Sequence, residues 1–186
     1  WFAVEADGSE KAAAYSSLDI TRYEFGQDAS FQNTAEYIAS VLVAWGLELL
    51  GASGQPVLLR GDSVSALSWA MRGVTRSDRA IPAAVMWNQF LMVKQVQVVD
   101  TVHLSHELNS RTDILSRGGS WADVLAEDSS HYRSSLPREC RFLDLQDSPL
   151  LDLLDPMADI NTEDGFNEFF KASLTFLQTQ PAGASA

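Results

Sequence analysis

The segment from Thr34 to Leu50 constrains the fold more than any other part of this chain. Its apolar residues surround most of a helix instead of forming one stripe, which is typical of a helix at the centre of a core. Thr34 suits the N-cap position, and Gly51 stands where helices commonly end. We therefore expect a central core helix here, with Glu36 in the first turn, where the helix dipole favours a negative charge.

Strand-like and helix-like patterns alternate after this helix as far as Arg117. The predicted elements, in chain order, are a buried strand over residues 56–62, a helix over 63–71, a long helix over 79–95, a strand over 96–104 and a short helix over 109–117. Pro82 is tolerated in the long helix because it lies in the first turn. This alternation is typical of an α/β fold in which helices cover a mixed sheet.

Two short strands are predicted before the core helix, over residues 1–6 and 12–16. Asp7-Gly between them is a dipeptide typical of hairpin turns. Residues 20–25 alternate apolar and polar side chains and predict a further strand or an extended loop. We therefore treat residues 1–117 as one α/β domain.

A different composition begins at Gly118-Gly-Ser, which marks a boundary between the domain and an acidic extension over residues 118–186. A short helix is predicted in this extension from Ser148, an amphipathic helix over residues 162–178, and a disordered end after it. We expect the apolar stripe of the amphipathic helix to dock back on the domain, and a surface for a protein partner is the alternative. The stripe consists of Phe166, Phe169, Phe170, Leu174 and Leu177.

The net charge of −12 argues against non-specific binding to nucleic acid, because neutralising phosphates requires clustered Lys and Arg. The charge is uneven, however: residues 1–117 carry 13 acidic and 9 basic side chains, and residues 118–186 carry 12 and 4. No apolar run reaches the roughly 18 residues that span a bilayer, so we expect no membrane partner. Cys140 is the single cysteine, which fits a reducing intracellular compartment, cytoplasm or nucleus.

Three acidic residues stand at the end of a predicted buried strand or on a helix next to it, where an enzyme that binds metal ions is expected to place its acids. Glu36 lies near the start of the core helix, Asp62 ends an apolar strand, and Asp113 lies in the last short helix. His103 stands at the end of the preceding strand. Carboxylate clusters of this kind hold two divalent ions about 3.5–4 Å apart in enzymes that hydrolyse phosphodiesters, and Mg²⁺ suits such sites.

Each of these residues alone also has an ordinary structural explanation. Glu36 favours the helix dipole, and Asp62 suits the cap of the next helix. Asp113 has the spacing for an ion pair with Arg117 one turn later. His103 is an ordinary polar residue at a strand end. The four together, in this order and spacing, favour a functional explanation over four separate structural ones.

The stretch from Thr34 to Arg117 resembles the ribonuclease H domain of retroelement reverse transcriptases. In that family a Glu near the start of the main helix is followed by a strand that ends in Asp-Ser, as Glu36 and Asp62-Ser are here. Retroelement members then carry His-x-Pro-Gly-x-x-Asn-x-x-Ala-Asp-x-Leu-Ser-Arg. This chain has His103-Leu-Ser-His-Glu-Leu-Asn109-Ser-Arg-Thr-Asp113-Ile-Leu-Ser-Arg117. Ser-His in place of Pro-Gly and Thr in place of Ala change the stiffness of the loop and leave the ligands unchanged.

This resemblance implies a ribonuclease H-like mixed sheet flanked by helices, and an endonuclease that hydrolyses the RNA strand of an RNA–DNA hybrid. It implies that Glu36, Asp62 and Asp113 bind two Mg²⁺ ions, with Mn²⁺ as an alternative. His103 would help to manage the water or the release of product, and Asn109 would be structural or adjacent to the substrate. The implied partners are the hybrid and the upstream reverse transcriptase domain of the same polyprotein.

Phosphate contacts are expected from the densest basic stretch before the extension. It contains Arg72, Arg76 and Arg79. The alternative is that these are ordinary solvated charges in a loop and at the start of a helix.

The family carries a fourth acid, an Asp in its first strand, and its position in this chain stays open. Asp28 lies only eight residues before Glu36, which leaves no room for two further strands. Asp7 leaves 29 residues and is the better candidate. We favour a first strand upstream of Trp1, because the segments around Asp7 look like the second and third strands of the family. A chain truncated in this way would bind metal poorly and cut little or nothing.

Two other functions remain open. A catalytically inactive ribonuclease H-fold module would serve packing or connection inside a reverse transcriptase. An acidic protein-interaction domain would act through the Phe166–Leu177 face of the last helix and would show no affinity for nucleic acid. The presence of all three acids together with His103 favours a catalytic origin.

Overall fold

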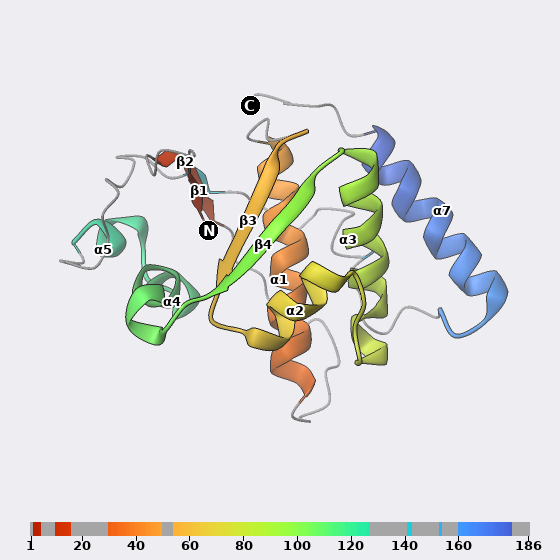
Figure 1. Cartoon of the computed structure of the whole chain (residues 1–186), viewed down its shortest axis with the longest axis horizontal. Coiled ribbons are helices and arrows are strands. Elements are labelled where there is room, and N and C mark those ends of the chain that lie inside the picture. Colours follow the sequence, from red (N-terminus) through yellow and green to blue (C-terminus); the bar gives the residue numbers. More distant parts are fainter. Residues whose placement is uncertain are drawn as a thin grey trace.

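The computed structural model describes residues 2–4, 10–15, 30–49, 54–126, 141–142, 153 and 160–179. They form a mixed α/β arrangement that is mostly helical and contains a two-stranded parallel sheet (Figure 1). In chain order the helices and strands are β1 (Phe2–Val4), β2 (Glu10–Tyr15), α1 (Ser30–Leu49), β3 (Pro56–Gly61), α2 (Val64–Arg72), α3 (Ile81–Val93), β4 (Gln97–His103), α4 (Ser110–Ser116), α5 (Trp121–Ala126), β5 (Arg141–Phe142) and α7 (Glu163–Thr179). None of the described helices is long and apolar enough to cross a membrane.

The N-terminal strands β1 and β2 form the predicted antiparallel hairpin, with Phe2 opposite Ala13. β2 also pairs in parallel with β5, which gives a small sheet of order β1-β2-β5. Several predicted features lie outside the described residues and stay predictions. They are the turn at Asp7-Gly, the strand over residues 20–25, the helix end at Gly51 and the helix from Ser148.

β3 and β4 form a parallel pair in which Leu59 lies opposite Thr101 and Gly61 lies opposite His103. Their connection contains α2 and α3, because parallel strands need a long crossover. Both strands run across α1 (Figure 1). The strands predicted over residues 56–62 and 96–104 are confirmed, whereas the larger ribonuclease H-like sheet stays a prediction.

The prediction that β3 is a buried strand is wrong. Only Leu59 of β3 is buried, and it belongs to the same core cluster as Val41 of α1. The opposite face carries Leu58, which is 40% exposed, and Val102 of β4, which is 38% exposed. Parallel strands are usually covered on both faces. The apolar composition of β3 therefore indicated burial on two faces, while the described elements bury only one.

The core helix α1 is confirmed, but it begins at Ser30, four residues before the predicted N-cap. Thr34 consequently lies inside the helix and is fully buried, with its Oγ1 3.2 Å from Oγ of Ser77. Glu36 lies in the second turn and not in the first, so the helix dipole does not account for it. The predicted start was wrong because the hydroxyl of Thr34 does not cap the helix. It contacts Ser77, which lies in another segment.

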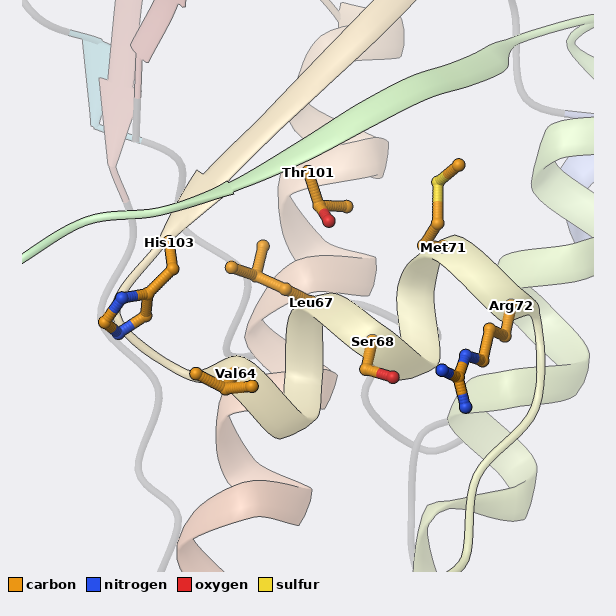
Figure 2. Close-up of a pocket in the computed structure, with 7 residues that line it drawn as sticks. All are labelled: Val64, Leu67, Ser68, Met71, Arg72, Thr101 and His103. Carbon is orange, nitrogen blue, oxygen red and sulfur yellow. The ribbon is translucent and has the colours of Figure 1, made fainter.

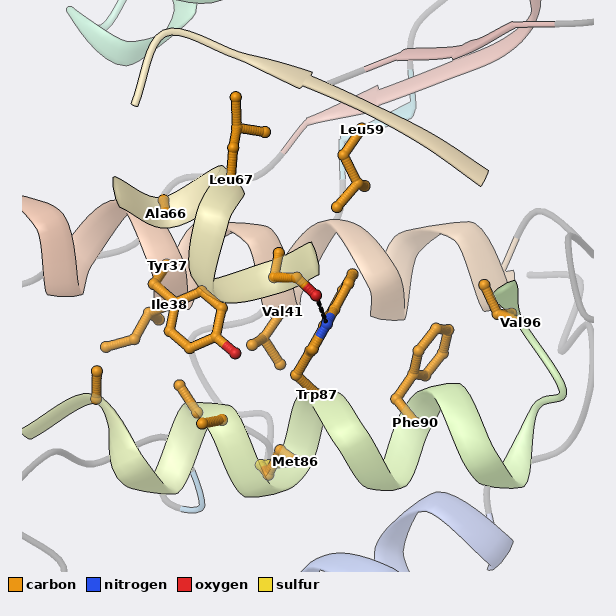
Figure 3. Packing of buried hydrophobic residues seen from close by; sticks show 14 of the residues in the cluster. Tyr37, Ile38, Val41, Leu59, Ala66, Leu67, Met86, Trp87, Phe90 and Val96 are labelled. Carbon is orange, nitrogen blue, oxygen red and sulfur yellow. Dashed lines mark hydrogen bonds between the residues drawn. The ribbon is translucent and has the colours of Figure 1, made fainter. Parts of the chain in front are cut away.

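The core lies between α1, α2 and α3 (Figure 3). Tyr37, Ile38 and Val41 of α1 are buried in it, as expected of a central helix. Trp87 of α3 is 1% exposed, and its indole Nε1 donates a hydrogen bond of 2.8 Å to the backbone oxygen of Ala70 in α2. This bond satisfies the one polar group of the side chain and fixes α3 against α2.

The amphipathic helix predicted over residues 162–178 is present as α7 and packs on α3. Phe169 and Leu177 are buried in the core cluster, so part of the apolar stripe docks back as expected. Phe166 and Phe170 stay exposed. Only these two aromatic rings of the stripe are therefore available as a surface for a protein partner.

The boundary predicted at Gly118 is followed closely by a short helix, α5, that the sequence patterns missed. Ser120 and Asp123 begin this helix with reciprocal hydrogen bonds: Ser120 N and Oγ donate to Asp123 Oδ2 at 2.7 and 2.6 Å, and Asp123 N donates to Ser120 Oγ at 3.2 Å. The bonds from the Ser120 side chain and backbone lower the pKa of Asp123. α5 contacts α4, so the beginning of the extension is attached to the domain.

Candidate active site

Asp62 and His103 meet at the carboxyl ends of the parallel strands β3 and β4. Asp62 follows the last residue of β3, and His103 is the last residue of β4. The ring Nε2 of His103 lies 3.2 Å from the backbone oxygen of Asp62, within hydrogen-bond distance. Crevices outside the carboxyl ends of parallel strands are common ligand sites in α/β proteins. We refer to Asp62 and His103 together as the strand-end corner.

Asp62 does not cap the helix that follows it. Ser63 is the N-cap of α2, and its Oγ accepts a hydrogen bond of 3.2 Å from the backbone N–H of Ala66. The side chain of Asp62 is exposed at the strand-end corner. The capping explanation for Asp62 is therefore wrong, because the neighbouring serine fills that role.

Asp113 lies in α4 and forms the ion pair that its spacing indicates. Nε of Arg117 lies 2.9 Å from Oδ2 of Asp113, and the side chains are 72% and 29% exposed, respectively. Nε also lies 2.9 Å from Oδ1. Both carboxylate oxygens of Asp113 therefore lie within hydrogen-bond distance of Nε of Arg117.

Glu36 is half-buried on α1, where Oε1 accepts a hydrogen bond of 3.0 Å from Nε2 of Gln32. Asn109 is half-buried just before α4, where the hydroxyl of Thr112 donates to its backbone oxygen at 2.9 Å and also lies against its side-chain oxygen. Asn109 thus orders the start of α4. The threonine that departs from the family pattern is part of that arrangement.

Among the residues that the structure describes, no three His, Cys, Asp or Glu side chains are grouped closely enough to hold a metal ion. The structure brings Asp62 and His103 together, but it does not gather Glu36, Asp62 and Asp113 into one cluster. This geometry consequently does not fit a two-metal site as it stands, and we derive no step of a reaction through a metal. The metal roles of these three acids stay predictions.

A pocket of about 260 Å³ opens beside the strand-end corner, between α2 and β4 (Figure 2). His103 and Arg72 both line it, whereas Arg76 does not. Two further lining residues, Ser68 and Thr101, were missed from the sequence. Their spacing carried the signal: Thr101 precedes His103 by two on one face of a strand, and Ser68 shares a helical face with Arg72.

Comparisons of this chain with family models, with curated proteins and with solved structures give no match.

Proposed function

We propose that this chain is a ribonuclease H-like domain of a retroelement reverse transcriptase, and that it hydrolyses the RNA strand of RNA–DNA hybrids. The sequence support is the ordered motif from His103 to Arg117 together with Glu36 and Asp62-Ser. The structural observation that carries the proposal is the strand-end corner, where the exposed ring of His103 lies 3.2 Å from the backbone oxygen of Asp62, itself an exposed residue at the end of the neighbouring parallel strand.

In this proposal the residues of the corner act on the scissile phosphodiester and on water. An imidazole at a strand end is well suited to accept or donate a proton within hydrogen-bond reach of a water. Discrimination of RNA from DNA would rely on contacts to the 2′-hydroxyls across the wide minor groove of the hybrid. The partner domain would be the upstream polymerase of the same polyprotein.

Magnesium binding by Glu36, Asp62 and Asp113 belongs to the proposal and has its own test. In NMR spectra of this chain, Mn²⁺ should broaden the amide signals of Glu36, Asp62 and Asp113 before those of other segments. Mg²⁺ should compete and restore the signals. Broadening that begins elsewhere, or that leaves Asp62 untouched, would contradict these ligands.

The activity test uses the chain and a longer protein that begins upstream of Trp1, with a hybrid that carries a labelled RNA strand. We expect Mg²⁺-dependent cutting of the RNA strand by the longer protein, and loss of cutting in Asp62→Asn. Asp100→Asn is the matched control, because Asp100 is also an exposed aspartate, on β4. Cutting that persists in Asp62→Asn would contradict the assignment of Asp62 as a metal-binding catalytic residue.

One observation favours a second candidate, the catalytically inactive module. Among the described residues, Glu36, Asp62 and Asp113 are not gathered into a cluster that could hold a metal ion. This candidate predicts that the longer protein folds and associates with the polymerase domain but cuts no hybrid in Mg²⁺ or in Mn²⁺. The same labelled-strand assay therefore separates the two candidates.

A further inference from the structure

The pocket between α2 and β4 is built from one face of a helix and one face of a strand (Figure 2). The helix contributes Val64 and the residues three, four, seven and eight positions after it, which share one helical face. The strand contributes Thr101 and His103, which are two residues apart and therefore share one face of the strand. The lining residues are Val64, Leu67, Ser68, Met71, Arg72, Thr101 and His103. These elements are held by the core through Leu67, which is buried, so the pocket has a fixed floor.

The charge of the lining differs from that of the whole chain. The chain carries 25 acidic and 13 basic residues, yet no acidic residue lines the pocket, while Arg72 and His103 do. In Figure 2 these two side chains lie at opposite ends of the pocket. Arginine matches phosphate geometry with paired N–H donors. The lining therefore favours an anionic ligand with oxygen acceptors.

The remaining surface combines hydroxyl groups with apolar side chains. Ser68 and Thr101 supply the hydroxyls, and Val64 and Met71 are 64% and 46% exposed beside them. A ribose ring presents both hydroxyls and an apolar face, so it matches this mixture. The pocket, about 260 Å³, is open to solvent and smaller than the roughly 300–1,000 Å³ typical of sites that enclose a whole small molecule, so a ligand would lie in it only in part, as one unit of a longer chain would.

We infer that this pocket binds one sugar–phosphate unit of a nucleic-acid strand, with the guanidinium of Arg72 on the phosphate and Val64 and Met71 against the sugar. The inference rests on the proposed function and deepens it, because His103 belongs both to the pocket and to the strand-end corner. The bound unit therefore lies next to the phosphodiester at the corner. Arg72 is a substrate-binding residue, and Arg76 is an ordinary surface charge.

The first test compares Arg72→Gln with Arg76→Gln in the whole chain, with a short fluorescent RNA–DNA hybrid and EDTA so that binding is measured without cutting. Both arginines are exposed and lie four residues apart in the sequence, so each variant removes one positive charge from the surface. We expect Arg72→Gln to weaken binding roughly tenfold and to reduce the salt slope by about one, because one phosphate contact is lost. Arg76→Gln should weaken binding less than about twofold.

Equal losses of affinity in the two variants would show a diffuse electrostatic effect and would contradict binding in the pocket. Absence of any binding to the hybrid at low salt would overturn it as well. Unfolding of each variant in urea is measured alongside, and both substitutions should leave the midpoint unchanged because the side chains are exposed.

The second test follows methyl signals of the unaltered chain by NMR while adenosine 5′-monophosphate is added. The methyl groups of Val64 and Met71 should shift, whereas those of Val74 should not. Val74 is a matched control because it is 60% exposed, close to the 64% of Val64, and does not line the pocket. Inorganic phosphate should move the signal of the Arg72 side chain and leave the methyl groups unmoved. Shifts of Val74 equal to those of Val64 would contradict the inference.

These outcomes separate the pocket from the proposed hydrolysis. Selective loss of binding in Arg72→Gln, together with no Mg²⁺-dependent cutting by the longer protein, would retain the pocket and reject the enzyme. Cutting that is lost in Asp62→Asn while Arg72→Gln binds like the unaltered chain would retain the enzyme and reject the pocket.

Discussion

The helical block of α1, α2, α3 and α7 and the strand-end corner use their polar groups in opposite ways. In the block, polar atoms are buried and paired: the side chain of Gln89 is 2% exposed and accepts a hydrogen bond of 2.6 Å from Ser173. At the corner, Asp62 and His103 are exposed. Buried polar groups need internal partners, whereas exposed ones can exchange water for a ligand. The comparison indicates that the block stabilises the fold, whereas the polar groups of the corner stay accessible to solvent.

Loss of Trp87 should give the largest effect on the block. Trp87→Ala removes a side chain that is 1% exposed and its hydrogen bond to Ala70, so we expect the free energy of unfolding to fall by about 4 kcal/mol. Urea unfolding followed by circular dichroism measures this. Met92→Ala on the same helix is the control, because Met92 is 64% exposed and its loss should cost less than about 0.5 kcal/mol. Similar losses in both variants would contradict the packing of α3.

The polar contact between α3 and α7 should give the next largest effect. Ser173→Ala leaves Oε1 of Gln89 buried without the hydroxyl that donates to it, and we expect a loss of about 2 kcal/mol. The double variant Ser173→Ala with Gln89→Met should recover part of that loss, because both partners are then apolar. If the losses of the two single variants simply add, the contact does not couple the helices.

Tyr37 is the exception inside the block. Its side chain is fully buried, and its hydroxyl has no hydrogen-bond partner among the described residues. Tyr37→Phe should therefore be neutral or stabilising by up to about 1 kcal/mol near pH 7. A fall of more than about 1 kcal/mol in the free energy of unfolding would show that the hydroxyl has a hydrogen-bond partner, as the side chain of Gln89 has.

Alkaline pH gives a second measurement on the same residue. Burial raises the pKa of Tyr37 above the ordinary tyrosine value, so the folded state retains a proton that the unfolded chain releases. Its contribution to stability is complete below about pH 10 and is lost as the pH rises above that value. The difference between the urea midpoints at pH 8 and at pH 10.5 should consequently be smaller for Tyr37→Phe than for the unaltered chain.

The smallest effect is expected beside the candidate site. Arg117→Gln breaks the ion pair with Asp113, but the arginine side chain is 72% exposed and water screens the pair, so the loss should stay below about 0.5 kcal/mol. Arg117→Lys, which keeps the charge, is the control. A loss above about 1 kcal/mol in the glutamine variant alone would show that this region is held as tightly as the helical block.

Local sequence patterns predicted where several helices and strands lie. The strands at residues 56–62 and 96–104, the helix with Pro82 in its first turn and the amphipathic helix α7 were all found in this way. The sequence also indicated that Asp62 and His103 each stand at the end of a strand. These features depend on local spacing, which the sequence displays directly.

Features that depend on distant partners were not predictable. The start of α1 was misplaced because Thr34 bonds to Ser77, and the cap of α2 is Ser63 and not Asp62. The burial of Gln89 depends on Ser173 of α7, whose hydroxyl donates a hydrogen bond to its side chain. The pocket combines residues of α2 with residues of β4, and their approach follows from the crossover and not from any local pattern.

The contact between Gln89 and Ser173 joins positions 84 residues apart, and it has a consequence for the order of unfolding. α7 meets the domain mainly through α3, whereas α1 contacts both α2 and α3. A helix attached mainly through one neighbour is a natural unit of partial opening. We expect the amide hydrogens of α7 to exchange with solvent as a group when α7 detaches from α3. Those of α1 should exchange only through global unfolding. Hydrogen exchange at increasing urea concentrations would order the two events.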